Sequence, residues 1–420
     1  MEYKVYDCGS YRVHTIKTDK FKNCSMEIMF RNKLVKTEIT ENNMLVDMLM
    51  HSSKKYPKRR DVAIELENLY SSFIRGCVTR LGNSVMLSFV TDFLNPKYCE
   101  EGYLEDILSM PFEMILNPNI ENEEFDRRSF NIIKNRIKSD IESLKENATR
   151  YAFRRSLTHM DNMSPSSYYM VGYMDDLDNI TPSSLVKTYN RVLNNYVCDI
   201  YVIGNLDMEQ VVSIIRDKFS INTVKNSDIQ LYVDNNVRKK AQEICEVGSY
   251  EQDSFVMIYN LDNLSQREKN FVIHLYNIIL GSGGLTSKLY KYLREENSLC
   301  YVVSSMYQKY DGLLMIYSGI DKKDKKKCIK LVNKALNEMV IGDFTEEELD
   351  NAKKSVISSI KMSEDTNGGI INNYLFNDLD GLPLYDERVK EFKTITKQEI
   401  MEVAKKIKLN TIYLLSGEDK

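Results

Sequence analysis

Apolar positions in this chain alternate between helical spacing and continuous runs of the kind that form buried strands. A helical segment containing Leu185 and Val192 leads into the apolar run 198–204. The same order returns near the carboxyl end, where the helical segment 400–407 leads into the run 411–417. The pattern predicts a helix followed by a strand at the end of each half of the chain.

Each of these helices begins at a threonine that can cap the free backbone N–H groups of the first turn. Pro182 follows Thr181 at the first helical position, where its missing N–H costs nothing. In the second copy, Thr396 and Glu399 have the spacing of a capping box. Matching caps ahead of matching strands indicate an internal repeat.

Two further segments correspond between the halves in the same order. One long amphipathic helix is expected from Glu123 onward and another from Glu347 onward. The strand-like runs 24–30 and 254–259 form the third pair. We therefore predict an α+β protein of two homologous domains, each a mostly antiparallel sheet with long helices packed against it.

The segment between the two copies, residues 221–242, is polar and lacks a sustained period. We expect it to connect an amino-terminal domain over 1–220 with a carboxyl-terminal domain over 243–420.

Composition excludes some classes of function. A formal net charge of -4 with 28% charged residues gives no basic field for binding nucleic acid. The basic run 54–60 lacks an aromatic stacking platform, so a solvated loop is favoured over RNA contact. The eight cysteines stand singly and are expected to be free, mostly buried thiols. No leader pattern opens the chain and no stretch has the roughly 18 apolar residues of a membrane span, so we predict a cytoplasmic protein.

The most distinctive segment is a glycine loop that follows the helical stretch 271–280. The loop consists of Gly281, Ser282, Gly283 and Gly284. Nucleotide binding is disfavoured, because a phosphate loop follows a strand and has the order Gly-x-x-x-x-Gly-Lys-Ser/Thr. As a turn between helices, the loop would use its three glycines for positive φ, with Thr286 or Ser287 capping the next helix.

This segment resembles the carboxyl-half signature of the insulinase and mitochondrial-processing-peptidase family. The resemblance covers 280–301 and ends in Arg-Glu-x-x-x-Leu-x-Tyr, departing from the family at Asn297 and Ser298, where a basic residue and glycine are frequent. In two-chain bacterial members, one polypeptide binds zinc and the other presents this Arg and Tyr to the substrate across a shared chamber. The resemblance assigns those contacts to Arg294 and Tyr301 and makes the glycine loop a substrate loop.

The chemistry of this pair is plausible on the residues alone. Arg294 is expected on the last helical turn and Tyr301 near the start of the next strand, so both can point into one cavity. A guanidinium and a phenol can hold a substrate carbonyl or the oxyanion that develops on it. The alternatives are a solvated Arg294 paired with Glu295 or Glu296, and a half-buried strand position for Tyr301.

An active member of this family needs His-x-x-Glu-His on a helix of the first half, because two imidazoles one turn apart bind zinc while the glutamate activates water. The corresponding positions hold Asp47, Met48, Leu49, Met50 and His51. Met50 replaces the general base, and the other histidines, at 14, 159 and 274, are isolated in sequence. We expect no metal on this chain, with residual binding at Asp47 and His51 as the alternative.

The resemblance implies a subunit that is not catalytic alone and whose two domains face each other like half of a clamshell. It would pair with a paralogous zinc-motif subunit, so that zinc sits on the partner and an unstructured peptide is the substrate. Similarity extends to a bacterial branch associated with modification of elongation factor P and to paired peptidases of bacteriocin maturation. The rival prediction is a scaffold or peptide-binding protein with no associated proteolysis.

Overall fold

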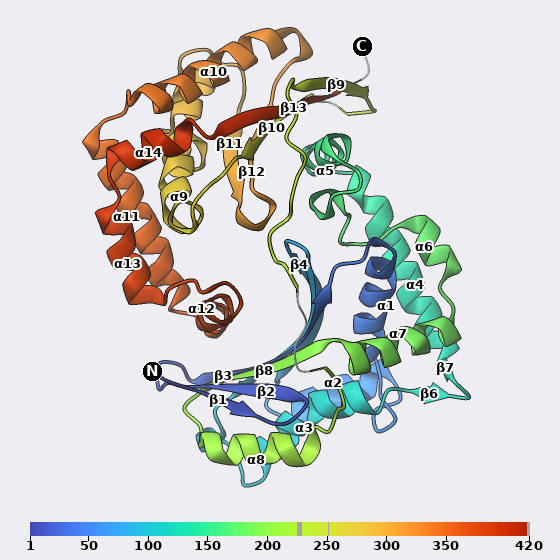
Figure 1. Cartoon of the computed structure of the whole chain (residues 1–420). Coiled ribbons are helices and arrows are strands. Elements are labelled where there is room, and N and C mark those ends of the chain that lie inside the picture. The colour runs from blue at the N-terminus through green and yellow to red at the C-terminus, as the bar shows by residue number, and fades with distance from the viewer. Residues whose placement is uncertain (225–228, 251, 418–420) are drawn as a thin grey trace. The chain divides into compact units, whose positions relative to one another are not determined.

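Two mixed sheets, one in each half of the chain, organise the fold of the computed structural model (Figure 1). The structure describes residues 1–224, 229–250 and 252–417. In spatial order, the strands of the first sheet are β1 (Glu2–Asp7), β2 (Tyr11–Lys17), β8 (Val197–Gly204), β3 (Asn23–Lys33), β5 (Ser84–Leu94) and β4 (Phe73–Leu81). Those of the second sheet are β9 (Gln242–Val247), β13 (Ile407–Ser416), β10 (Ser254–Leu261), β12 (Leu313–Gly319) and β11 (Val303–Gln308).

Apart from the additional edge strand β1 of the first sheet, both sheets have the same strand order and the same pairing directions. β8 pairs in parallel with β2 and antiparallel with β3, as β13 pairs in parallel with β9 and antiparallel with β10. Beyond β3 and β10 the remaining pairs, through β5 to β4 and through β12 to β11, are antiparallel. The predicted α+β fold with two homologous, mostly antiparallel halves is confirmed, and the strand runs matched in the sequence occupy equivalent positions.

The chain divides into two units that are not single stretches of sequence. Unit 1 contains Met1–Glu142, Tyr169–Leu231 and Thr366–Asn372, and unit 2 contains Ser143–Tyr168, Tyr232–Asp365 and Asn373–Lys420. The predicted domains 1–220 and 243–420 are each continuous, so they differ from these units at two places. Residues 143–168, which contain helix α5 (Ala148–Met160), belong to unit 2, and residues 366–372 belong to unit 1. Residues 225–228 of the predicted connection and residues 251 and 418–420 of the predicted second domain lie outside the described residues.

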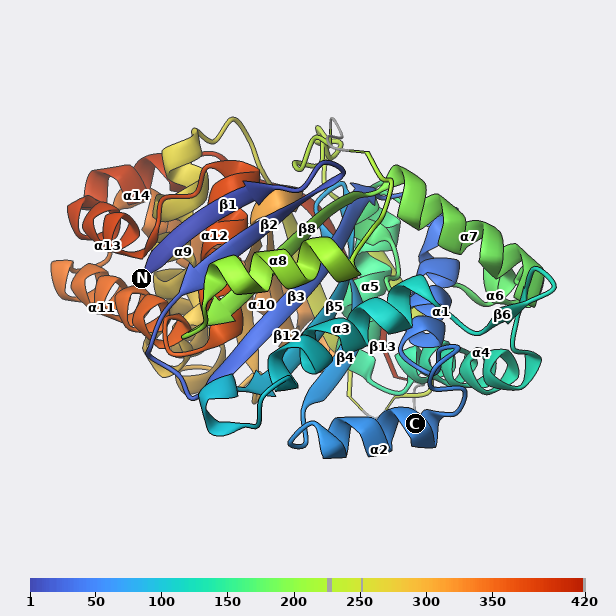
Figure 2. The same cartoon turned by 90° about the horizontal axis from the view of Figure 1, so that it is seen from below.

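In unit 1, helices cover one face of the sheet. Strand β8 is buried at every position, as a central strand requires. Helices α3 and α8 lie side by side on this face (Figure 2), and α1 packs against β4, where Gly76 leaves room for Val46. The helices of this unit are α1 (Ile39–Leu49), α2 (Arg59–Asn68), α3 (Tyr103–Leu116), α4 (Arg127–Glu142), α6 (Met174–Asn179), α7 (Pro182–Asn195) and α8 (Met208–Lys218).

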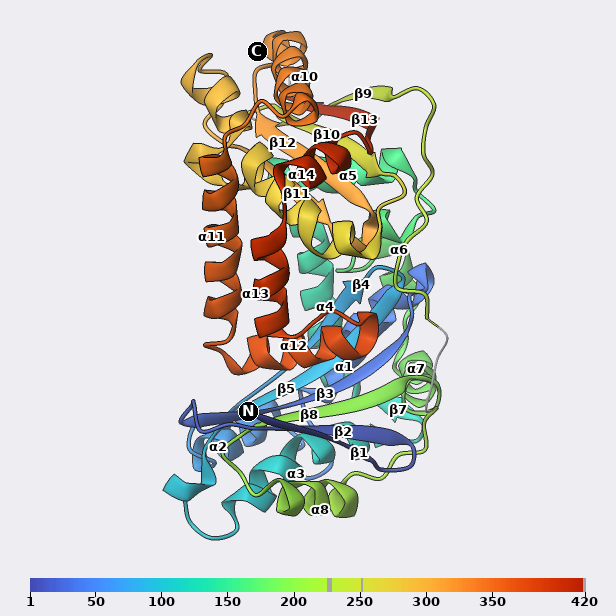
Figure 3. The same ribbon diagram turned by 60° about the vertical axis from the view of Figure 1, so that its left-hand side comes forward.

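In unit 2, α5 packs on β10 and β13, with Ala152 and Leu157 in the same core as Val256 and Tyr413. Helices α11 and α13 run side by side (Figure 3). The longer helices after the glycine loop are α10 (Lys325–Ile341), α11 (Glu346–Ser363), α13 (Tyr385–Thr394) and α14 (Lys397–Ala404). Helix α12 (Asn367–Asp380) contributes its first residues to unit 1 and the rest to unit 2.

The predicted helix caps are present. Thr181 Oγ1 accepts a hydrogen bond from Ser184 N at 3.1 Å, with Pro182 in the first turn. In the second copy, Thr396 N donates to Glu399 Oε2 at 2.8 Å, and Thr396 Oγ1 accepts from Glu399 N at 3.3 Å. These reciprocal bonds satisfy backbone donors that a helix start leaves unpaired.

The helix predicted from Glu123 onward begins later than expected. Glu123 has a left-handed φ of 61° and lies in a tight turn between β6 (Ile120–Glu121) and β7 (Glu124–Phe125). Asp126 then caps α4 by accepting from Ser129 N at 2.8 Å. The acidic residues were therefore turn and cap residues rather than the first helical turn.

An ionic cluster lies on β2, β3 and β8 of unit 1. Asp199 is 2% exposed, and its Oδ1 lies 2.8 Å from Arg12 Nε and 3.3 Å from His14 Nε2. Its other oxygen, Oδ2, lies 3.7 Å from a guanidinium nitrogen of Arg31. Burial alone would raise the pKa of Asp199, but the bonds from His14 and Arg12 lower it to about 2. The carboxylate is therefore ionised and paired at neutral pH.

Two remaining sequence predictions concern the state of the cysteines and the presence of membrane-spanning segments. All eight cysteines are free thiols, and four of them are buried. Within the described residues, no helix is both long enough and apolar enough to cross a membrane.

Candidate functional site

The glycine loop lies between two helical segments that contain π turns. Around α9 (Ile273–Asn277), the stretches Glu268–Val272 and Ile278–Ser282 are π-helical, and so is Tyr290–Glu295 after the loop. The π turn after the loop shows in the hydrogen bond of 2.9 Å from Glu296 N to Lys291 O. Such turns are rare and occur frequently at functional sites. The helix expected over 271–280 is thus present, with an α-helical centre and a π turn on each side.

The three glycines of the loop serve two different purposes, which corrects the expectation that all have positive φ. Only Gly284 has one, at 65°. A Cβ at Gly281 would lie 2.5 Å from Ser305 Oγ, and one at Gly283 would lie 2.6 Å from Ile278 O. Close packing therefore requires glycine at these two positions, and it seats the loop against β11.

The remaining polar residues of the loop fix its ends. Asn277 Nδ2 donates to Ser282 Oγ at 3.0 Å. Of the two predicted caps, Ser287 takes the role, since its Oγ accepts from Tyr290 N at 3.4 Å, whereas Thr286 donates to Gly283 O. The loop is thus a defined turn whose tip exposes Gly284.

The structure brings Arg294 and Tyr301 together. Arg294 lies on the last turn of Tyr290–Glu295, and Tyr301 lies two residues before β11, as predicted. Arg294 Nη1 donates to the Tyr301 carbonyl at 2.9 Å. The guanidinium carbon lies 4.9 Å from the Tyr290 ring centroid and 5.9 Å from that of Tyr301, which are cation–π distances.

Neither alternative for this pair describes it. Within the described residues, Arg294 contacts Tyr290 and Tyr301 and forms no ion pair with Glu295 or Glu296. The side chain of Tyr301 is 80% exposed, so it is not a half-buried strand residue. The pair therefore stands at the surface, held by stacking and by one backbone hydrogen bond.

The turn between Arg294 and Tyr301 contains both departures from the family signature. Ser298 has a left-handed φ of 51°, the conformation that glycine adopts without cost. Ser298 N bonds to Arg294 O at 3.0 Å and Leu299 N to Leu293 O at 2.8 Å, which is a Schellman-type helix end. Asn297 Nδ2 donates to Tyr292 O at 2.8 Å. Ser298 therefore has the backbone conformation that a glycine at this position would favour.

Arg294 and Tyr301 line an open cavity of about 440 Å³. Cys300 lies in its wall, and burial raises the pKa of that thiol, so it is protonated at neutral pH. A guanidinium carries five donors, and one of them serves the Tyr301 carbonyl. Such a cavity can accept a carbonyl or carboxylate oxygen beside Arg294. Its lining residues are Gln252, Arg294, Ser298, Leu299, Cys300, Tyr301, Gly319, Ile320, Asp321 and Asp324.

The positions of the zinc motif do not fit a metal ion. Asp47 lies in α1 and is ion-paired with Arg136 of α4, so a guanidinium already neutralises the carboxylate. Met50 is 8% exposed and brings no carboxylate. Burial, and secondarily Arg59, lower the pKa of His51. Across residues 1–224, 229–250 and 252–417, no group of three His, Cys, Asp or Glu side chains is placed to hold a metal ion.

The duplicated topology relates the degenerate motif to the glycine loop. In unit 1, α1 and the residues after it connect β3 to α2 and then to β4. In unit 2, the helical stretch 268–282 and the glycine loop connect β10 to the Arg294 segment and then to β11. The glycine loop therefore takes, in unit 2, the place that residues 47–51 take in unit 1.

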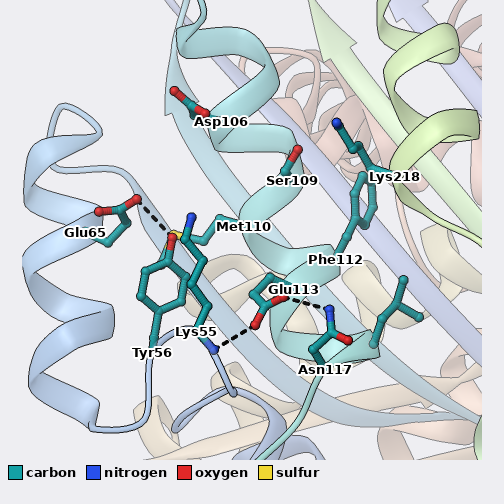
Figure 4. A pocket seen from close by; sticks show the side chains of 11 residues that line it. Lys55, Tyr56, Glu65, Asp106, Ser109, Met110, Phe112, Glu113, Asn117 and Lys218 are labelled. Atoms are coloured by element: carbon teal, nitrogen blue, oxygen red, sulfur yellow. Dashed lines mark hydrogen bonds between the residues drawn. The ribbon is translucent and has the colours of Figure 1, made fainter.

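Another cavity, of about 250 Å³, lies beside α3 in unit 1 (Figure 4). Its polar groups bond mainly to one another: Tyr56 donates to Glu65 at 2.9 Å, and Glu113 accepts from Lys55 N and Asn117 Nδ2. The carboxylates of Glu65 and Glu113 are therefore already bonded to neighbouring residues, and we assign no ligand to this cavity.

Sequence reasoning missed three residues next to the site. Lys288, Tyr292 and Glu338 form a buried hydrogen-bonded group that joins the Arg294 segment to α10. Lys288 and Tyr292 are one helical turn apart, but Glu338 is far from both in sequence, so no local pattern links them. A lysine on the apolar side of the segment, beside Leu289, was the available signal.

Comparison with known proteins relates this fold and site to inactive peptidase homologues. Residues 179–356 match a family model described as the Peptidase M16 inactive domain, a range that includes the glycine loop, Arg294 and Tyr301. The chain is thus similar to inactive homologues of the M16, or insulinase-like, metallopeptidases.

Individual relatives support this assignment. The chain is 26% identical over 418 residues to "Probable inactive metalloprotease YmfF" of Bacillus subtilis, covering 98% of this chain and 97% of that protein. It is also 26% identical to "Uncharacterized zinc protease YmxG" of the same organism over 144 residues, covering 33% of this chain and 35% of that protein. A conserved protein from Enterococcus faecalis has the same fold, with a TM-score of 0.94 at 23% identity and full coverage of both chains.

Proposed function

We propose that this chain is the non-catalytic subunit of a heteromeric zinc metallopeptidase. It forms part of a peptide-binding chamber and presents Arg294 and Tyr301 to a substrate held beside the zinc ion of a paralogous partner. The observation that carries the proposal is the contrast between the two halves: the metal positions are disabled, while the Arg–Tyr pair is fixed on a cavity.

The disabled metal positions support an assisting role rather than an independent one. An M16-type reaction needs a metal-bound water and a carboxylate base. Here Asp47, at the first ligand position, is ion-paired with Arg136, and the base position is occupied by the buried Met50. Any hydrolysis would therefore depend on zinc from another chain.

The preserved pair supports contact with a polarised carbonyl. Arg294 is permanently charged, and stacking on Tyr290 and Tyr301 orients its planar group. Charged donors aimed at a developing oxyanion stabilise it most in a site that excludes water. A partner that closes over the cavity would create such a site.

The relatives from Bacillus subtilis support a two-chain arrangement. One is named an inactive metalloprotease and the other a zinc protease, and this chain is similar to both. An organism with both kinds of chain has the components that such a heteromer needs. The predicted association with elongation factor P modification and the cytoplasmic location stay predictions.

The experiment combines this chain with a zinc-motif homologue from the same cell. We expect the two to co-elute on size exclusion, and the mixture to cleave an unstructured fluorogenic peptide in a chelator-sensitive way. This chain alone should show no turnover. Failure of the two chains to associate, together with chelator-sensitive cleavage by this chain alone, would contradict the proposal. A complex that forms without any cleavage would instead favour the scaffold.

A further inference from the structure

A buried ion pair anchors the helical segment that carries Arg294. Lys288 and Glu338 are each 7% exposed, and Lys288 Nζ lies 2.8 Å from Glu338 Oε2. The second carboxylate oxygen, Oε1, accepts a hydrogen bond from the Tyr292 hydroxyl at 2.6 Å. Lys288 Nζ also donates to Asp343 O at 2.6 Å, just after α10. One carboxylate on α10 therefore holds two side chains, one turn apart, on the segment before Arg294.

The contacts continue from this ion pair to the site. Tyr292 lies two residues before Arg294 in the π turn, and its carbonyl accepts from Asn297 Nδ2 at 2.8 Å. Lys334 of α10 lies 4.0 Å from the centre of the Tyr292 ring. The π turn and the following helix end are thus tied to α10 on one side and to the Arg294–Tyr301 contact on the other.

Stability alone is a weak reason to bury these charges. Burial would raise the pKa of Glu338, yet the hydrogen bonds from Lys288 and Tyr292 lower it, so the carboxylate is ionised at neutral pH. Apolar side chains of similar volume often stabilise a core as well as a buried ion pair does. The ion pair adds specificity of orientation. Its hydrogen bonds fix the rotation of the segment about its own axis and its position along α10.

We propose that Lys288, Tyr292 and Glu338 are positioning residues that hold Arg294 at the distance and orientation needed to contact substrate. This proposal rests on the proposed function, since it concerns the same site. A displacement of about 1 Å at a reacting group can lower a rate roughly a hundredfold, so such an anchor has measurable consequences.

The test replaces both charges at once. Lys288→Met combined with Glu338→Met leaves no buried charge unpaired, so the fold should survive, and Tyr292→Phe is a milder variant that removes one hydroxyl. The matched control is Lys309→Met with Asp380→Leu. That pair is a half-buried lysine–carboxylate pair, and its carboxylate accepts a hydrogen bond from the Tyr232 hydroxyl at 3.0 Å.

Each variant is assembled with the zinc-motif partner and assayed for peptide turnover. We expect the Lys288/Glu338 double variant to lower kcat about tenfold to a hundredfold, with little change in complex assembly. The Lys309/Asp380 control should change kcat less than about twofold. In an Arg294→Ala background, the Lys288/Glu338 changes should have little further effect, because they act through Arg294.

The outcomes separate the two proposals. If Arg294→Ala lowers turnover but the Lys288/Glu338 changes do not, or if they cost the same with and without Arg294, the positioning role is overturned and the proposed function stands. If Arg294→Ala itself leaves turnover unchanged, the proposed function fails and this role fails with it. An equal loss in the Lys309/Asp380 control would show general destabilisation and also overturn the positioning role.

Discussion

Replacing Asp199 by asparagine should weaken unit 1 without affecting unit 2. The change keeps the side-chain shape and removes the charge that pairs with Arg12, His14 and Arg31. The pKa of Asp199 falls from an ordinary 3.8 to about 2, which corresponds to about 2 kcal/mol of stability at neutral pH. Arg12 is partly exposed and can be solvated in the variant, so a loss of about 2 to 3 kcal/mol is expected.

Hydrogen–deuterium exchange measured by mass spectrometry resolves this loss by segment. Peptides from β2 and β8 should exchange faster, by about 30-fold or more for amides that open with the sheet, while peptides from β9 to β13 should not change. The matched control is Glu246→Gln, which removes a carboxylate bound by Arg155 and Tyr413 in unit 2 and should affect only that unit. Unchanged exchange in β2 and β8 would refute the reasoning.

The pH dependence gives a second check on Asp199. Its pKa is depressed in the folded state, so its contribution is fully present above the unfolded pKa of 3.8 and is lost as pH falls through about 2. In urea titrations, the difference between wild type and Asp199→Asn should be constant from about pH 5 to 8 and shrink below about pH 4. A difference in the free energy of unfolding that grows as the pH falls would contradict the depressed pKa of Asp199.

Three further changes test the site. Gly281→Ala places a Cβ 2.5 Å from Ser305 Oγ and should cost about 1 to 3 kcal/mol by urea unfolding, whereas Gly368→Ala, with nothing within 4 Å, should cost nothing. Ser298→Gly relieves a left-handed φ of 51° and should raise the free energy of local opening of the turn at 297–301 by up to about 1 kcal/mol, so its amides should exchange more slowly; faster exchange would refute this. Asp47→His should still leave less than about 0.1 zinc per chain by mass spectrometry of the metal, because two histidines alone do not make a complete ligand set; stoichiometric zinc would refute it.

Much of the fold followed from local patterns. The caps at Thr181 and Thr396 and the runs that became β8 and β13 depend on neighbours in sequence, so the repeat was visible before the structure. The start of α4 was placed too early because an acidic turn at Glu123 resembles a first helical turn. Helix propensity alone does not distinguish an acidic turn from the first turn of a helix; the hairpin between β6 and β7 does.

The site was only partly predictable, because local sequence patterns do not report contacts between distant segments. The glycine loop, Arg294 and Tyr301 lie within one short segment and could be recognised together. The pairing of Lys288 with Glu338 depends on how α10 packs, and the pairing of Asp47 with Arg136 depends on how α4 packs. Contacts between distant segments leave no periodic signal in a single sequence.

The central claim, that this chain supplies substrate contacts but no metal, is tested most directly by the kcat of the assembled heteromer. With complexes matched in concentration, Arg294→Ala and Tyr301→Phe should each lower kcat, Arg294→Ala by about a hundredfold or more, as loss of an oxyanion donor does. Lys291→Ala, which removes an exposed cation from the same helical segment, should leave kcat unchanged. Intact complexes whose kcat is the same with Arg294→Ala and Tyr301→Phe as with the wild-type chain would contradict the account.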